Sequence, residues 1–155
     1  MSLNNVKEYL KKFNLESRII ELKESSATVK DAAIALQTNE ENIAKSLSFL
    51  VEDKPILIIC SGTTRIDNHK FKEQFHSKAN MINRENVASL IGHEPGGVCP
   101  FAINKDVKVY LDESLKKLDI LYPATGNATS AVKLTLEELI KTVENFSAWI
   151  DIGKE

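Results

Sequence analysis

A continuous apolar run, PILIICSG at residues 55–62, most constrains the fold that this sequence can adopt. A short run without polar alternation is typical of a strand whose two faces are both covered. In the segment before it, IAKSLSFLVED, successive side chains would point to opposite sides of a strand. The intervening DKP indicates a turn. We therefore expect a hairpin at the centre of a sheet that other elements cover on both faces.

Strand-like and helix-like segments are interleaved along the rest of the chain. Further strands are expected at 18–22, 107–112, 118–123, 130–135 and 146–151. Helices are expected over 1–14, where Val6, Leu10 and Phe13 share a face, after Thr28, over 67–75 and 84–91, and after Thr135, which forms a capping box with Glu138. This order predicts a single α/β domain over residues 1–155, with α+β-like features. The hairpin makes the sheet mixed rather than purely parallel.

Charge and apolar content limit the classes of partner. The chain has 155 residues and a formal net charge of -2, without a block of basic residues, so only a small basic face is available for nucleic acid. The longest apolar run, at 56–60, is too short to cross a bilayer. Cys60 and Cys99 lack neighbours at metal-ligand spacing. We expect a cytoplasmic protein with no membrane partner, metal or cofactor.

Lys45 interrupts the apolar side of the first hairpin strand. It has the same parity as Ile43, Leu47 and Phe49, so its side chain leaves the strand on their side. A lysine there must either extend to water or hold its charge beside an anion, and both outcomes place it at the edge of a site. From pattern alone, an edge lysine whose stem merely covers apolar surface is the favoured interpretation.

Two further polar positions lie where predicted strands end. Asp67 is suited to cap the helix at 67–75, and Arg65 and Lys70 beside it are placed to face phosphates. The alternative is a capped helix with an exposed polar face. Asp112 ends the strand at 107–112, where it could bind an amine, orient a water molecule or simply cap the next turn.

The loop HEPGGVCPFA at 93–102 combines backbone freedom with rigidity. Gly96 and Gly97 permit close approach of the main chain to a ligand, and the two prolines restrict the loop. Amide N–H groups fixed in this way suit a carbonyl or a developing oxyanion. An ordinary tight turn is the alternative.

Cys99 in the same loop raises a different possibility. A thiolate near main-chain donors, with His93 as its base, would suffice for acyl transfer. The sequence does not show whether these two side chains meet.

Five segments occur in an order and spacing that resemble a known family. They are AAIALQTNEENIAKSLSFL, CSGTTRIDNHKFK, IGHEPGGVCPFAI, VKVYLDESL and PATGNATSAVKLTLEEL. The chain resembles the YbaK and prolyl-tRNA-synthetase-associated domain family over roughly residues 27–151. The resemblance implies a mixed sheet partly wrapped as a barrel with flanking helices. It also implies a freestanding trans-editing deacylase, which hydrolyses the ester between a wrong amino acid and the 3′ end of a tRNA.

The resemblance assigns roles to individual residues. Lys45 matches a lysine that anchors the phosphate or aminoacyl end of the substrate. Gly96, Gly97, Val98, Cys99 and Pro100 match a G-x-x-x-P loop whose amides hold the ester carbonyl. Water then attacks with help from the substrate's own hydroxyl, so no protein nucleophile is needed. The implied substrate-binding residues are Arg65, Asp67, Lys70, Asp112, Tyr122, Gly126, Asn127 and Ser130.

The chain departs from the family where the rejected amino acid is chosen. Tyr122 precedes the proline in a stretch where alanine-directed members carry a histidine, and the turn at 126–130 reads GNATS. Small volume differences decide such preferences. We expect a Cys-tRNA(Pro)-like substrate or another small amino acid. The expected partners are the acceptor end of aminoacyl-tRNA and an aminoacyl-tRNA synthetase. Two alternatives stay open: a non-catalytic module that binds tRNA or a synthetase, and a Cys99 hydrolase.

Overall fold

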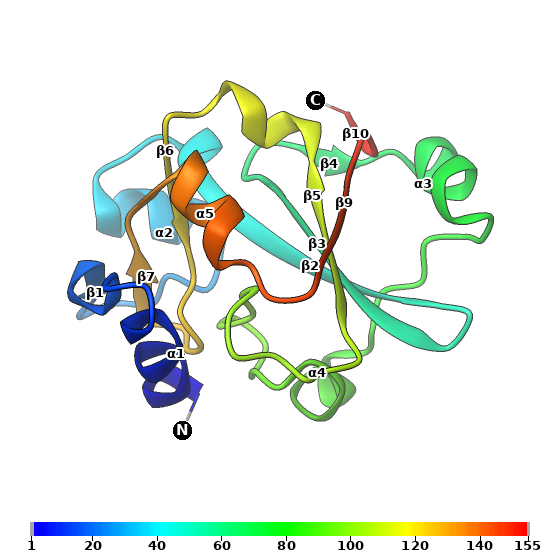
Figure 1. Ribbon diagram of the computed structural model, residues 1–155. Coiled ribbons are helices and arrows are strands. Elements are labelled where there is room, and N and C mark those ends of the chain that lie inside the picture. Colours follow the sequence, from blue (N-terminus) through cyan, green and yellow to red (C-terminus); the bar gives the residue numbers. More distant parts are fainter. Residues whose placement is uncertain (1, 155) are drawn as a thin grey trace.

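A computed structural model describes residues 2–154 and places the predicted hairpin at the centre of a six-stranded sheet. The strand order is β8-β6-β2-β3-β5-β9, and the sheet curls into an open half-barrel (Figure 1). The strands are β2 (Ile43–Val51), β3 (Lys54–Ser61), β5 (Lys108–Asp112), β6 (Ile120–Pro123), β8 (Leu134–Thr135) and β9 (Phe146–Ile150). The expectation of a central hairpin is confirmed.

The sheet is mixed, as predicted. β2 and β3 are antiparallel and meet in a two-residue turn at Glu52 and Asp53, both with positive φ. β2 pairs with β6, β3 with β5 and β5 with β9 in parallel, whereas β6 and β8 are antiparallel. Two small antiparallel ladders flank this sheet: β1 (Ile19–Glu21) with β7 (Ser130–Val132), and β4 (Arg65–Ile66) with β10 (Gly153–Lys154).

Helices cover both faces of the sheet, which explains the unbroken apolar run of β3. Leu57 and Ile59 face the main core, to which α1 (Ser2–Lys11), α4 (Arg84–Ile91) and α5 (Leu136–Thr142) contribute. On the opposite face, Ile58 packs with Phe71 of α3 (Asn68–Phe75). α2 (Val29–Leu36) covers the beginning of β2 on that face, through a separate small cluster around Ile43.

The helix starts follow from local capping chemistry. The hydroxyl of Thr28 accepts the Asp31 N–H at 3.1 Å, and Asp67 caps α3. Thr135 and Glu138 form the expected capping box at α5. Short 3-10 helices occupy Glu16–Arg18, Glu40–Asn42 and Glu113–Lys117.

Two predicted elements differ from the structure. α1 ends at Lys11, and Asn14 adopts a positive φ of 60° that reverses the chain, so Phe13 lies outside the helix and is exposed. The segment 130–135 is not one strand, because β7 pairs with β1 and β8 pairs with β6, with the break at Lys133. Among residues 2–154, no helix has the length and apolar character needed to cross a membrane.

Candidate functional site

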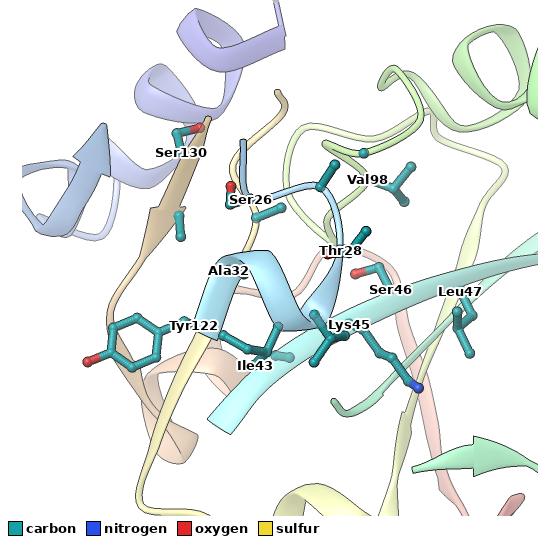
Figure 2. Close-up of a pocket in the computed structure, with 16 residues that line it drawn as sticks. Ser26, Thr28, Ala32, Ile43, Lys45, Ser46, Leu47, Val98, Tyr122 and Ser130 are labelled. Atoms are coloured by element: carbon teal, nitrogen blue, oxygen red, sulfur yellow. The ribbon is translucent and has the colours of Figure 1, made fainter. Parts of the chain in front are cut away.

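A pocket of about 250 Å³ opens beside the first half of β2. Its walls come from the start of α2, from β2, from the 93–102 loop and from the segment that follows β6 (Figure 2). The lining includes five residues that the sequence singled out: Lys45, Gly96, Val98, Tyr122 and Ser130. The topology therefore brings together residues that lie up to 85 positions apart in the chain.

Lys45 lies on the sheet face that α2 and α3 share, between the Ile43 cluster and the Phe49 cluster. Its side chain is partly buried, and in the described part of the chain no hydrogen bond or ion pair is recorded for it. Its cross-strand partner is Cys60. Burial raises the pKa of the Cys60 thiol to about 12, and the positive charge of Lys45 has a weaker effect in the opposite direction. The neutral thiol therefore offers no counter-charge to the ammonium group of Lys45.

The two glycines of the 93–102 loop have different roles. Gly96 has a φ of 92° and lines the pocket. Gly97 donates its N–H to the C=O of Glu94 and accepts the N–H of Gly126, both at 3.0 Å. A Cβ on Gly97 would lie 2.4 Å from the main-chain nitrogen of Asn127. Gly97 therefore joins two loops, and its amide is already occupied.

The remaining residues of this loop divide between the pocket and the core. The N–H groups of Gly96 and Val98 make no hydrogen bond within residues 2–154, and both residues line the pocket. Pro100 is buried, and its C=O accepts the N–H of Glu144 at 3.0 Å. The loop thus contributes two residues with unbonded N–H groups to the pocket and is anchored through Pro100.

A side-chain network fixes Ser130 at the pocket wall. The Ser130 hydroxyl accepts from Thr125 at 2.5 Å and donates to Asn127 Oδ1 at 2.6 Å. Gly126 and Asn127 do not line the pocket themselves. They hold the turn that carries Ser130 and supports Gly97.

Cys99 and His93 do meet, but inside the core. Cys99 Sγ lies 3.4 Å from His93 Nε2, and Nε2 lies 2.6 Å from the carbonyl oxygen of Phe101. Both side chains are buried, with exposures of 0% and 1%. Burial raises the pKa of the Cys99 thiol to about 12 and lowers the pKa of His93. Neither residue lines the pocket, so the pair lacks the access and ionisation that a nucleophile needs.

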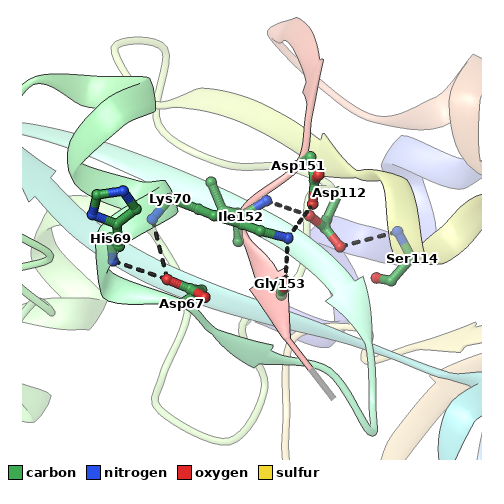
Figure 3. Close-up of polar contacts among 8 residues, drawn as sticks. All are labelled: Asp67, His69, Lys70, Asp112, Ser114, Asp151, Ile152 and Gly153. Atoms are coloured by element: carbon green, nitrogen blue, oxygen red, sulfur yellow. Dashed lines mark hydrogen bonds and ion pairs between the residues drawn. The ribbon is translucent and has the colours of Figure 1, made fainter.

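Asp67 and Lys70 belong to a second polar cluster, around the C-terminal strand (Figure 3). The Lys70 ammonium group donates to Asp151 Oδ1 at 3.0 Å and to the C=O of Gly153 at 2.9 Å. Asp67 accepts the N–H groups of His69 and Lys70, and the Lys70 bond is the largest cause of its lowered pKa. These groups use their charges to hold the chain itself.

Asp112 and Arg65 lie in the same region. Asp112 is 2% exposed, and its two oxygens accept the N–H groups of Ser114 and Ile152, both at 3.0 Å. Arg65 pairs with Lys154 in the β4–β10 ladder. A separate cavity of about 230 Å³ opens beside Asp112. None of Arg65, Asp67, Lys70 and Asp112 lines the Lys45 pocket.

Sequence reasoning missed three polar residues of the pocket: Ser26, Thr28 and Ser46. Thr28 was recognised only as a helix cap. Ser46 has the opposite parity to Lys45, so the alternation of β2 separates the two side chains without showing that both border one pocket. To place both side chains at the pocket, one must know which strand ends beside Lys45 and Ser46.

Comparisons with known proteins agree with this arrangement. A family profile described as an aminoacyl-tRNA editing domain matches residues 23–142. The uncharacterized protein YwhH of Bacillus subtilis (strain 168) is 43% identical over 100% of this chain and 99% of its own length. Proline--tRNA ligase of the same organism is 30% identical over 59% of this chain, which corresponds to only 16% of the ligase. A crystal structure described as a candidate trans-editing enzyme for prolyl tRNA synthetase has a TM-score of 0.87 at 28% identity and covers 99% of this chain and 98% of its own.

Proposed function

The chain belongs to the aminoacyl-tRNA editing domain family, and we propose that it is a freestanding trans-editing deacylase. In this proposal it hydrolyses the ester of a mischarged tRNA in the cytoplasm. The tRNA acceptor end is its substrate, and a synthetase is its second partner. Support comes from the match to YwhH over nearly the whole length of both chains, and from the pocket geometry.

One observation carries the proposal: an unpaired ammonium group and unbonded main-chain amides meet at one pocket. Lys45 supplies the charge, and Gly96 and Val98 supply the donors. An aminoacyl-tRNA end offers matching groups, because it has a phosphate and an ester carbonyl close together. Lys45 would bind the anionic end, and the loop amides would donate hydrogen bonds to the carbonyl oxygen.

The same groups account for the hydrolytic step. A water molecule adds to the carbonyl carbon, and the amide donors stabilise the negative charge that gathers on the carbonyl oxygen. The free hydroxyl of the terminal ribose orients this water. The carbon–oxygen bond to the ribose then breaks, and the ribose oxygen takes up a proton. No step needs the buried thiol of Cys99.

The dimensions of the pocket favour a small acyl group. The apolar part of the lining includes Ala32, Ile43, Ala124, Ala131 and the ring of Tyr122. These side chains leave a volume of about 250 Å³ for the acyl group and part of the terminal adenosine. This supports cysteine or another small amino acid as the group removed.

A deacylation screen tests the proposal directly. The purified protein is incubated with tRNA(Pro) and other tRNAs charged with each small amino acid, and the loss of the ester is followed over time. We expect rapid hydrolysis of at least one mischarged tRNA. Binding of charged tRNA without turnover across the whole panel would overturn the deacylase and favour a binding module instead. Treatment with iodoacetamide should leave the activity intact, whereas its loss would favour the Cys99 hydrolase.

A further inference from the structure

Ser46 lies at a gap in the edge of β2. On one side of the gap, β6 pairs with β2 only as far as Ala44. On the other side, Ile82 donates its N–H to the C=O of Ser48 at 3.1 Å. Neither neighbour reaches Ser46, and Ser46 lines the pocket described above.

The pairing of the hairpin fixes the direction of the Ser46 main chain. Val51 and Lys54 close a two-residue turn, so odd-numbered residues of β2 direct their N–H and C=O groups toward β3. Even-numbered residues direct theirs to the other edge, as the bond from Ile82 to Ser48 demonstrates. The N–H and C=O of Ser46 therefore point into the gap, and no hydrogen bond to them is recorded within residues 2–154.

The side chain of Ser46 is also without a partner. Its Oγ is buried and makes no hydrogen bond to the described residues. Figure 2 shows that Ser46 leaves β2 on the side opposite Lys45. Buried polar groups are almost always paired, because an unpaired one costs about 1–3 kcal/mol. Ser46 thus has three polar groups without partners at the wall of a pocket. This indicates that a ligand provides the missing hydrogen-bond partners.

The ligand that fits best has a donor and an acceptor on one carbon atom. In an antiparallel ladder, two facing residues exchange both of their N–H to C=O bonds. An aminoacyl group carries an α-ammonium donor and a carbonyl acceptor in the same relation. We infer that the aminoacyl group pairs with Ser46 as a single added strand residue, which deepens the proposed function and rests on it.

Both main-chain groups of Ser46 then have a defined use. Its C=O accepts from the α-ammonium group of the substrate, and its N–H donates to the acyl carbonyl. The carbonyl oxygen thereby gains a donor in addition to those of the 93–102 loop. The site selects α-amino acyl groups over α-hydroxy acyl and N-blocked acyl groups, which cannot complete both bonds.

Amide hydrogen exchange tests the pairing without relying on activity. In the free protein, the Ser46 N–H should exchange much faster than those of Lys45 and Leu47, which pair with β3. Uncleavable probes are 3′-aminoacylamido-3′-deoxyadenosines that carry alanine, serine, cysteine or threonine. Binding of such a probe should slow exchange at Ser46 at least tenfold. A probe with an α-hydroxyl in place of the amine should bind at least tenfold more weakly.

Two matched serine variants separate this contact from a general effect on the strand. Ser46→Ala removes the unpartnered hydroxyl but keeps the main-chain N–H and C=O, so probe binding should still slow exchange at residue 46. Ser48→Ala, two residues along the same edge, should leave binding unchanged, because Ile82 already occupies that position. Probe binding that leaves Ser46 exchange unaltered would overturn the pairing while preserving the deacylase. Failure of every probe to bind, together with no deacylation of any charged tRNA, would overturn the proposed function and the pairing with it.

Discussion

Two polar regions border the same central strands, and they differ in whether their polar groups have partners. Around the C-terminal strand, Lys70 and Asp112 make hydrogen bonds to groups of the chain itself. At the pocket, Lys45 and Ser46 have polar groups that nothing within residues 2–154 pairs with. Charge and position in the sequence made both regions candidates. The difference teaches that unmet hydrogen-bonding capacity, rather than charge, separates a ligand site from a structural clamp.

The largest expected contrast is between two lysines. Lys45→Ala should lower kcat/KM for deacylation by roughly 100-fold or more, since it removes the cation that meets the substrate. Lys70→Ala should change kcat/KM by less than about twofold and slightly lower thermal stability, because its bonds hold the C-terminal strand. Steady-state kinetics and thermal melts measure both. Equal losses of activity in folded Lys45 and Lys70 variants would place the second region in the substrate site.

Two glycines give a contrast in packing. Gly97→Ala puts a Cβ 2.4 Å from Asn127 nitrogen, so the loop must move and deacylation should fall at least tenfold. In the second region, Gly153→Ala puts a Cβ 2.3 Å from Thr64 Cγ2, and it should affect stability alone. Each should lower the free energy of unfolding by about 1–3 kcal/mol, as overpacking does. Urea unfolding and initial rates check this, and normal activity of Gly97→Ala would show that the loop geometry does not matter.

Asp112 offers a sharper test of the second region, since the family resemblance implies a pocket role for it. Asp112→Asn replaces one accepting oxygen with a donor that faces a main-chain N–H. We expect a loss of about 1–3 kcal/mol in the free energy of unfolding. The specific activity of the folded protein should stay the same. A stable but inactive Asp112→Asn protein would restore Asp112 to the site.

The smallest effect concerns pH. Burial lowers the pKa of His93 below its usual value of 6.5, so the unfolded chain takes up this proton more readily than the folded one. Stability should therefore decline as the pH falls below about 6.5. Urea midpoints between pH 8 and pH 5.5 measure the slope. His93→Gln should flatten it. An unchanged slope in His93→Gln would show that another titrating group causes the pH dependence of stability.

Sequence patterns predicted much of the fold because local physics controls the elements concerned. The unbroken apolar run placed β3 at the centre, and the capping residues Thr28, Asp67 and Thr135 marked helix starts. Two predictions were wrong: that Phe13 lies on the first helix, and that residues 130–135 form one strand. A left-handed residue and a change of strand partner decided those positions, and neither has a periodic signal.

The candidate site was only partly accessible to the same reasoning. The motifs drew attention to Lys45 and the 93–102 loop, which do meet at one pocket. They could not show that the Gly97 amide is already bonded, or that Cys99 and His93 touch within the core. Partners of this kind come from segments distant in the chain.

The sequence by itself determined the central hairpin, the helix caps and the family, because these depend on neighbouring residues and on motif order. Only the tertiary structure decided which polar groups are left for a ligand. β6 pairs with β2 only as far as Ala44, and the segment around Ile82 pairs with it from Ser48 onward. The gap between them depends on strand order and register, and these are set by contacts across the whole chain.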